Sequence, residues 1–311
     1  MIAAITLNIS IDRRYHVAGL HPGKVHRVDS CTYTAGGKGL NVARVAKALG
    51  EEVTAGGFIG GDAGRYVVRR LEQDGIAHFF TEVSGETRTC INIIDAATST
   101  HTEFLEPGMA ISPDEWRRFL SDFDSLTAKS DIVTLSGSLP PGLAGNAYAQ
   151  LITRAKDQNK RVFLDTSGKA LLEALSAKPA LIKPNREEAA ALAASADLSQ
   201  AELAKAAIDL HRSGIERVVI SLGEKGAMLA CSKGVLIGIP PRITPVNTVG
   251  CGDAMTAAFA VASLRQMDAQ EALRFAVAVS CASTLSADTG GLDLRDFDRV
   301  FGDVKVRSLY K

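Results

Sequence analysis

The sequence predicts an α/β fold with a mostly parallel sheet, and three observations support that prediction. β-rich runs alternate with helical patterns from the start of the chain: IAAITLNI precedes GLNVARVAKALG, and EVTAGGFIG precedes GRYVVRRLEQDG. The alternation resumes in four later runs, each followed by a helical segment: DIVTLSG (131–137), RVFLDTS (161–167), ALIKPN (180–185) and RVVISLG (217–223). Such alternation is typical of a parallel sheet covered by helices. The length of 311 residues, 46% of them hydrophobic, suits one large α/β domain.

Local signals support several of the helices. The S-x-x-E pattern of a capping box occurs at Ser112 to Glu115 and at Ser199 to Glu202, so we expect helices to begin there. The stretch AMTAAFAVASL after Asp253 lacks a polar stripe, which predicts a helix buried on most sides.

Two segments break the alternation. Residues 13–34 and 88–106 contain short strand-like runs with turns and no helix between them. We expect them to form a small sheet that stands off the main body as a lid over a cleft. The chain is therefore predicted to be a single domain, 1–311, that carries this lid.

Composition and charge exclude several classes of function. Lys+Arg and Asp+Glu both number 35, so no net charge attracts nucleic acid or an anionic membrane. The five cysteines are scattered and include no C-x-x-C pair, which argues against a disulfide framework and a zinc site and favours a reducing cytoplasm. The first residues lack the basic region of a signal peptide, and no apolar run approaches the length of a membrane span.

Ligands of open parallel sheets bind at the carboxyl ends of the strands, and the residues expected there include two glycine-rich turns. In AGGKGLN, glycines before a helix expose backbone amides and Lys38 adds a positive charge, so the turn suits a phosphate or a sugar. Leu40 stands where a P-loop has Ser or Thr. The alternative for this turn is a glycine turn with a surface lysine.

The second turn, VGCGD, places a carboxylate in a nest of amides at a helix start. Met255 occupies the third glycine position of the dinucleotide fingerprint, which excludes that motif. Asp253 could simply cap the helix. It could also be a base, because phosphoryl transfer to a hydroxyl needs anion-stabilising donors and a group that takes the proton.

Asn185 and Glu188 in KPNREE lie three positions apart, so both lie on one face of a helix if one begins there. Oxygen ligands of this kind suit Mg²⁺, held through water. The alternative is an ordinary helix cap with its glutamate partner.

Taken in order, nine motifs resemble those of the ribokinase-like, or PfkB, family of carbohydrate kinases, and the similarity runs over essentially the whole chain. The motifs are LNISIDR, AGGKGLNVARV, GFIGGDAG, GETRTCINI, SGSLPPGL, LDTSG, LIKPNREE, VVISLGEKGA and NTVGCGD. The greatest similarity is to the branch of tagatose-6-phosphate kinases and 1-phosphofructokinases. The resemblance implies a three-layer αβα fold with a mostly parallel central sheet and a small β-sheet lid, which often mediates homodimer formation.

The resemblance also implies roles for individual residues. Asp253 would be the general base, and the amides of Gly250, Cys251 and Gly252 would form the anion hole. Asp12, Gly37 and Asn41 would bind the sugar, Lys38 and Arg88 would bind its phosphate, and Ser138 would assist. On the nucleotide side, ATP would be bound by Lys183, Asn185, Ser221, Gly223, Gly226 and Thr248. Glu188 with Asn185 would organise Mg²⁺ through its waters.

The chain departs from the family pattern at three positions that carry no charge. Ile9 stands where the family often has proline, Cys251 where it has alanine, and Ala254 where it commonly has serine. A thiol at a helix N-terminus is expected to have a lowered pKa. Thiol reagents would then inactivate the protein and ATP would protect it, unless Cys251 is an inert small residue.

The expected activity is ATP-dependent phosphorylation of a ketohexose monophosphate. Tagatose 6-phosphate is the first choice, because of GETRTCINI and THTEFLEPG, and fructose 1-phosphate is the alternative. A 6-phosphofructokinase, a kinase of unphosphorylated sugars or nucleosides, and a non-catalytic sugar-phosphate-binding protein are less favoured. The combination of Lys38 and Arg88 disfavours unphosphorylated substrates.

Overall fold

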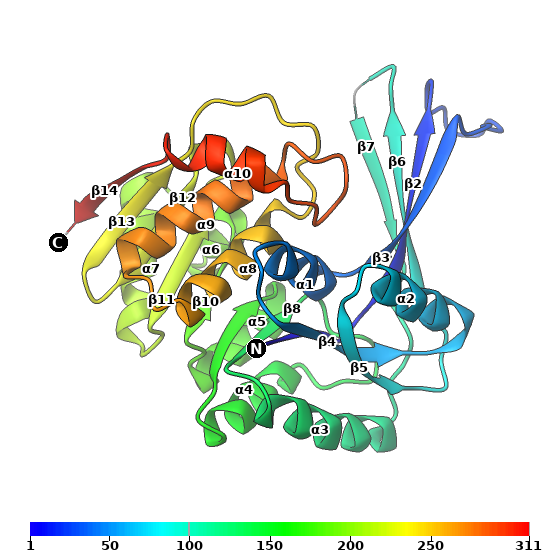
Figure 1. Cartoon of the computed structure of the whole chain (residues 1–311), viewed down its shortest axis with the longest axis horizontal. Helices are drawn as coiled ribbons and strands as arrows, with labels where there is room; N and C mark the ends of the chain where they lie inside the picture. The colour runs from blue at the N-terminus through cyan, green and yellow to red at the C-terminus, as the bar shows by residue number, and fades with distance from the viewer. Residues whose placement is uncertain (99, 311) are drawn as a thin grey trace.

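The computed structural model describes residues 1–98 and 100–310, and its largest element is a ten-stranded sheet (Figure 1). Ser99, within the segment 88–106 expected to form a lid, and Lys311 lie outside the described residues. The strand order is β14-β13-β12-β11-β10-β9-β8-β1-β4-β5. The strands are β1 (Ile2–Thr6), β4 (Val53–Ile59), β5 (Ala77–Glu82), β8 (Ile132–Ser136), β9 (Arg161–Asp165), β10 (Leu181–Ile182), β11 (Arg217–Ser221), β12 (Ala227–Cys231), β13 (Gly234–Ile239) and β14 (Lys305–Tyr310).

The pairing within this sheet is mostly parallel, as predicted. Every pair from β5 to β11 is parallel, and the edge from β11 to β14 is antiparallel. The central strands β1 and β8 are buried along their whole length and read as the apolar runs IAAIT and IVTLS. Such runs suit strands that are covered on both faces.

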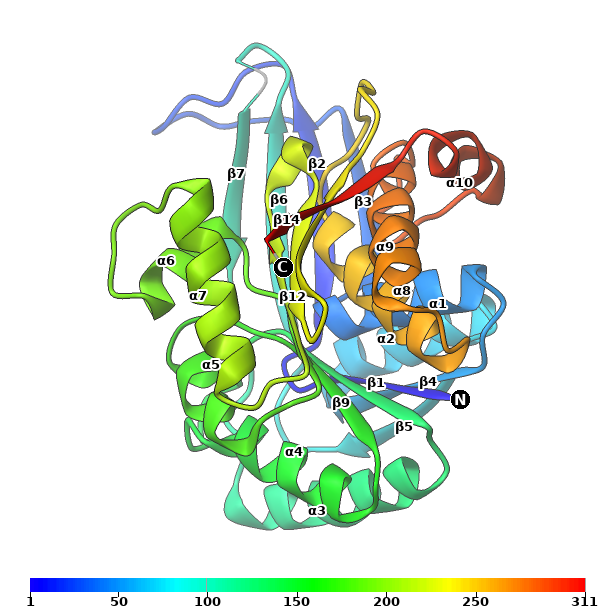
Figure 2. The same cartoon turned by 90° about the vertical axis from the view of Figure 1, so that its left-hand side faces the viewer.

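Helices cover both faces of the sheet and complete three layers, which confirms the predicted αβα arrangement (Figure 2). One apolar core joins the sheet to α1 (Lys38–Ala48), α2 (Gly61–Gln73), α8 (Cys251–Leu264), α9 (Ala269–Ser283) and α10 (Leu294–Phe301). The other joins it to α3 (Pro113–Ala128), α4 (Ala147–Asp157), α5 (Gly168–Ala174), α6 (Arg186–Leu192) and α7 (Gln200–Arg212). No helix of the described residues combines the length and the apolar character that a membrane crossing requires.

The local helix signals are borne out. Ser112 and Ser199 form the predicted capping boxes of α3 and α7 with Glu115 and Glu202. Helix α8 is buried from Asp253 to Ala262, because α1 and α9 pack on either side of it. Its first turn is thereby fixed against the rest of the core.

A second, four-stranded sheet, called the small sheet below, rises from one side of the main body (Figure 1). Its order is β3-β2-β6-β7, with β2 (Ser10–Val17), β3 (Ser30–Gly36), β6 (Arg88–Asp95) and β7 (Thr100–Leu105). β2 pairs antiparallel with β3 and parallel with β6, which pairs antiparallel with β7. These strands overlap the two segments that break the alternation in the sequence.

The small sheet is anchored at Asn8, in the short buried connection between β1 and β2. The Asn8 side-chain amide donates to the carbonyl of Pro107 at 3.0 Å and to the Ser138 hydroxyl at 3.1 Å. The backbone carbonyl of Asn8 accepts two hydrogen bonds from the Arg88 guanidinium, at 3.2 and 3.0 Å. Through these hydrogen bonds Asn8, which precedes β2, connects β6 and the segment after β7 to the carboxyl end of β8.

Candidate active site

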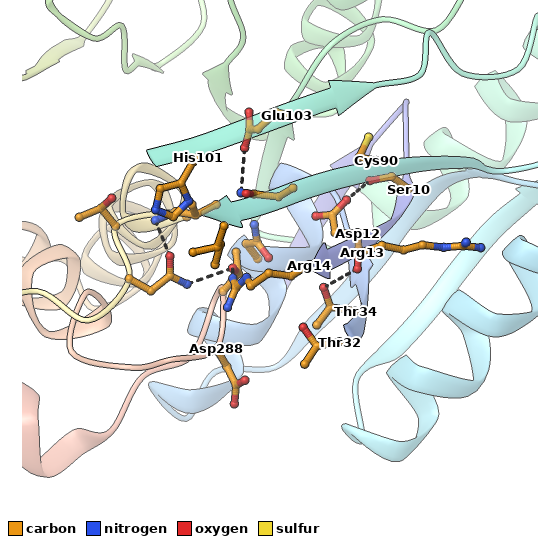
Figure 3. A pocket seen from close by; sticks show the side chains of 18 of the residues that line it. Ser10, Asp12, Arg13, Arg14, Thr32, Thr34, Cys90, His101, Glu103 and Asp288 are labelled. Carbon is orange, nitrogen blue, oxygen red and sulfur yellow. Dashed lines mark hydrogen bonds between the residues drawn. The ribbon is translucent and has the colours of Figure 1, made fainter. Parts of the chain in front are cut away.

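A cleft of about 860 Å³ lies between the small sheet and the carboxyl ends of the main strands. The wall contributed by the small sheet includes Ser10, Asp12 and Arg14 of β2 with His101 and Glu103 of β7 (Figure 3). The structure brings these predicted residues together in the cleft: Asp12, Gly37, Lys38, Asn41, Arg88, Thr248, Gly250, Gly252 and Asp253.

The start of α8 forms one end of the cleft and is open to an anion. Gly250 precedes the helix with a φ of 85°, a left-handed conformation that favours glycine. The first amides of a helix have no intrahelical acceptor, and Gly250 supplies no side chain to cap them. A Cβ at Gly252 would lie 3.2 Å from the Lys183 ammonium, so positive charge sits directly beside this turn. Amides, helix end and ammonium together favour phosphate.

Asp253 lies in the first turn of α8, only 5% exposed. The Asn41 side-chain amide donates to its Oδ2 at 2.8 Å. Burial raises the pKa of Asp253 to about 6, although Lys38, Lys183 and the Asn41 hydrogen bond act in the opposite direction. A carboxylate that titrates near 6 is well matched to proton abstraction at neutral pH.

Asp165, at the carboxyl end of β9, holds the two lysines of the site. Its carboxylate oxygens lie 3.2 Å from the Lys38 ammonium and 3.3 Å from that of Lys183. Burial acts to raise the pKa of Asp165, but Lys183 and Lys38 outweigh it and hold the pKa below its usual value. In return, Asp165 raises the pKa of Lys38. Asp165 was not among the predicted site residues, although its position at the end of a buried strand in LDTSG was a usable signal.

Asp12 lies on the wall formed by the small sheet. The Ser10 hydroxyl donates to its Oδ1 at 2.6 Å, and burial raises the pKa of Asp12 above its usual value. Gly36 on the paired strand must be small here, because a Cβ would meet the Asp12 carboxyl at 2.2 Å. A partly desolvated carboxylate on a strand that faces the cleft suits hydrogen bonding to sugar hydroxyls.

Arg88 and Arg14 are among the arginines of the small sheet that line the cleft. Arg88 lines it while donating to the carbonyls of Asn8 and Glu106, so its guanidinium is held by backbone on one side. Arg14 donates to the carbonyl of Ala287 at 3.0 Å and to the Thr289 hydroxyl at 2.8 Å. Arg14 was not among the predicted site residues. The alternation of SIDRR, which puts it on the same strand face as Asp12, could have identified it.

The remaining predicted residues lie outside the residues that line this cleft. Asn185 caps α6, accepting from the Glu188 amide at 2.7 Å, and Glu188 Oε2 accepts from the Asn185 amide at 2.8 Å. Ser221 forms a β-bridge with Asn185, next to the turn that contains Gly223 and Gly226. Ser138 accepts the hydrogen bond from Asn8. No cluster of three or more metal-ligating His, Cys, Asp or Glu side chains occurs among the described residues.

The expected low pKa of Cys251 is wrong. Burial raises the pKa of this thiol, and the neighbouring Asp253 raises it further, whereas Lys183 acts in the opposite direction. The Cys251 amide lies 3.4 Å from the carbonyl of Thr248, at the entrance of the helix. The helix N-terminus does not compensate for the loss of water around the sulfur.

Comparisons with solved structures show that the fold is shared with known carbohydrate kinases. Phosphofructokinase-2 from Escherichia coli, solved in complex with potassium, is 31% identical with a TM-score of 0.91, over 97% of this chain and 98% of that one. A protein described as a possible 1-phosphofructokinase, from Thermotoga maritima, is 26% identical with a TM-score of 0.88, over 99% of both chains. Ribokinase from Arabidopsis thaliana, at 20% identity and a TM-score of 0.80 over 96% of this chain and 98% of that one, shares the fold.

A family model covers almost the whole length of the chain. The model described as pfkB family carbohydrate kinase matches residues 2–294. With the glycine turns, the buried Asp253 and the shared fold, this match identifies the chain as a member of the pfkB family of carbohydrate kinases.

Proposed function

We propose that this protein transfers the γ-phosphoryl group of ATP to a hydroxyl of a ketohexose monophosphate. The observation that carries the proposal is the buried Asp253 carboxylate at an uncapped helix N-terminus, in the same cleft as Lys38 and Arg88. A base beside anion-stabilising amides is the arrangement that phosphoryl transfer to an alcohol needs.

Asp253 would take the proton from the attacking hydroxyl. Its raised pKa makes it a stronger base than an exposed aspartate, and the Asn41 amide fixes the direction of one carboxylate oxygen. The amides of Gly250, Cys251 and Gly252 would donate to the oxygens of the transferring group. Lys183, which Asp165 holds beside Gly252, would add positive charge at the same place.

The sugar phosphate would lie between the small sheet and α1. Asp12 and Asn41 would accept and donate hydrogen bonds to its hydroxyls, close to the turn at Gly37. Lys38 and Arg88 would bind its phosphate, with Ser138 accepting a hydrogen bond from Asn8 at the base of this pocket. Paired cations of this kind suit a dianionic group better than a neutral one.

The nucleotide would lie along the carboxyl ends of β10 and β11. This region includes Asn185, Ser221, Gly223 and Gly226, and Thr248 flanks the anion hole. The donor set fits Mg²⁺ held largely by water and phosphate oxygens, since Glu188 keeps Oε1 outside its capping bond. Bound Mg²⁺ would neutralise charge on the transferring phosphate.

Tagatose 6-phosphate is the substrate that the sequence motifs favour, with transfer to O1. Fructose 6-phosphate is the second candidate, because the E. coli phosphofructokinase-2 has also been solved with it, at 30% identity to this chain. Fructose 1-phosphate is the third, supported by the T. maritima neighbour. A non-catalytic binding protein would have no use for the complete set of base, glycines and lysines.

The exposed surface of the small sheet and the state of the cysteines support proposals on oligomeric assembly and on cellular compartment. Tyr33, Phe104 and Leu105 of the small sheet are exposed, which supports a homodimer formed through that sheet, and the E. coli relative has a tetrameric inhibited form. The small sheet would then act as both lid and interface. All five cysteines are free, as expected of a protein that works in a reducing cytoplasm.

The test is ADP release with Mg-ATP across a panel of acceptors, comparing kcat/KM for wild type and Asp253→Asn. The panel contains tagatose 6-phosphate, fructose 6-phosphate, fructose 1-phosphate, free ketohexoses and ribose. A preference of at least about tenfold for one phosphorylated ketohexose, lost in the variant, supports the proposal. Turnover of unphosphorylated sugars alone would remove Lys38 and Arg88 from the proposed phosphate site, and no turnover at all would favour the binding protein.

A further inference from the structure

Arg44, on α1, lies behind the proposed catalytic base and is not part of the cleft wall. Its Nη1 donates to Asn41 Oδ1 at 3.0 Å, and Asn41 Nδ2 donates to Asp253 Oδ2 at 2.8 Å. We propose that Arg44 is a positioning residue for phosphoryl transfer, which sets the orientation of the Asn41 amide and, through it, the direction and basicity of Asp253. The proposal rests on the function proposed above.

The guanidinium is held firmly enough to do this. Arg44 Nη2 donates to the carbonyl of Ala35, immediately before the glycine turn, and Nε lies 3.6 Å from the Asp74 carboxylate at the end of α2. Its side chain is 16% exposed. Three partners in three directions use the planar fork of an arginine in a way that a lysine ammonium cannot reproduce.

Arg44 determines which end of the Asn41 amide faces the base. A guanidinium only donates hydrogen bonds, so the atom of Asn41 that faces it must be the oxygen. The NH₂ group is then directed at Asp253. If the amide turned by 180°, an oxygen would face the Asp253 carboxylate and its hydrogen bond would be lost.

Two glycines, Gly250 and Gly290, lie against the Asn41 side-chain amide. A Cβ at Gly290 would lie 3.0 Å from Asn41 Oδ1, and one at Gly250 would lie 3.6 Å from its Nδ2. The two glycines therefore bracket the amide on the side of the anion hole. Of the two orientations of the Asn41 side-chain amide, the hydrogen bond from Arg44 selects the one in which the NH₂ group faces Asp253.

Other charges act on these groups and must be separated from this effect. Lys38, Lys183 and Asp165 surround Asp253, and Asp12, Asp74 and Arg70 surround Arg44. Removing the Arg44 charge would raise the pKa of Asp253 through space as well as through Asn41. A double-mutant cycle separates the two routes, because only the second requires Asn41.

The experiment measures kcat/KM against pH for wild type, Arg44→Met, Asn41→Ala and the double variant, on the best sugar phosphate. In parallel, ¹³C NMR follows the Asp253 carboxyl, with Asp253→Asn used to assign its signal. Losing a hydrogen bond to a charged group should move the pKa of Asp253, and the acidic limb, upward by about one to two units. We expect kcat to fall about tenfold, with a smaller change in KM for ATP.

Two further variants serve as controls. Arg44→Lys keeps the charge but not the fork, and we expect it to restore less than half of the shift. Arg265→Met removes a comparable arginine at the far end of α8, which contacts Glu51 and the Leu49 carbonyl, and should leave the pH profile unchanged. If Arg44→Met does not fold, Arg44→Lys carries the test by the same readouts.

The outcomes are distinct. The proposal is supported if Arg44→Met shifts the Asp253 titration clearly more in the wild-type background than in the Asn41→Ala background, where only the through-space effect of the charge remains. An equal shift in both backgrounds, or full rescue by lysine, would overturn it in favour of a simple charge effect. A shifted NMR titration with an unchanged pH–rate profile would leave the positioning intact and contradict Asp253 as the base.

Discussion

Replacing Asp253 by asparagine should abolish most of the phosphoryl transfer and also make the folded protein more stable. Asparagine preserves the size of the side chain and can still accept the hydrogen bond from Asn41, so the fold should survive. Removal of a general base typically lowers the rate by about 10² to 10⁴. The gain in stability arises because the native state keeps this carboxylate in a buried place that disfavours its charge.

The size of the gain follows from the pKa. Burial moves the pKa of Asp253 from 3.8 to about 6, and a shift of about two units corresponds to about 3 kcal/mol in the free energy of unfolding. Because the folded state binds the proton more tightly, wild-type stability falls as the pH rises from about 4 to about 6. The neutral amide of the Asp253→Asn variant would remove that loss, so the expected gain at pH 7 is about 1 to 3 kcal/mol.

The assay is urea denaturation of both proteins at pH 4, 5, 6 and 7.5, beside steady-state kinetics at pH 7.5. The difference in the free energy of unfolding should be close to zero at pH 4 and reach its full size above pH 6. A constant difference at every pH, or a less stable variant at pH 7.5, would show that burial does not perturb Asp253 as described. A variant that kept near-normal kcat would refute its role as base.

Three other changes test the surroundings of the base. Lys38→Met should raise KM for the sugar phosphate about tenfold or more and change KM for ATP much less, as measured by steady-state kinetics; equal effects on both would remove Lys38 from the sugar site. Asp165→Asn should lower the free energy of unfolding by about 3 to 5 kcal/mol, because it leaves the buried Lys183 without its counter-charge, and urea denaturation of this variant beside Arg265→Met would check it. Cys251→Ala should keep kcat within about twofold. Because burial raises the pKa of Cys251, mass spectrometry should find the wild-type thiol far less alkylated by iodoacetamide at pH 7 than at pH 9.5. Rapid alkylation at pH 7 that ATP blocks would contradict this.

The sequence predicted the layers of the fold because their signals are local. Apolar runs such as IAAIT and IVTLS specify strands that are buried on both faces, and Ser112 and Ser199 mark helix starts through hydrogen bonds three residues away. The strands β12 to β14 at one edge were not predicted, although β12 and β13 are also apolar runs, AMLAC and GVLIGI, because such a run does not say which strand it pairs with or in which direction. Their place depends on pairing between residues as far apart as Val235 and Tyr310.

The site was predictable only where one motif contains all of its parts. Gly250, Gly252 and Asp253 are neighbours in sequence, so their joint chemistry could be read directly. Asp165 pairs with Lys38, which is more than a hundred residues away in the sequence. Arg44 acts on Asp253 through the side chain of Asn41. The ion pairs of Asp165 with Lys38 and Lys183, and the hydrogen bond from Asn41 to Asp253 through which Arg44 acts, arise only when these segments pack together. Cys251 shows the converse, because a helix end suggested an acidic thiol and burial reversed the direction.

The junction at Asn8 bears on how such proteins could exchange sugar specificity by recombination. A chimera that took the small sheet from a relative would need the chain to be cut at both ends of two separate segments. Arg88 would have to travel together with the Asn8 carbonyl that it contacts, while the Asn8 amide would still have to match Ser138 and Pro107 of the recipient. The small sheet is therefore not an independent cassette. A working chimera should therefore exchange the segment around Asn8, the small sheet and the turns that contain Pro107 and Ser138 together.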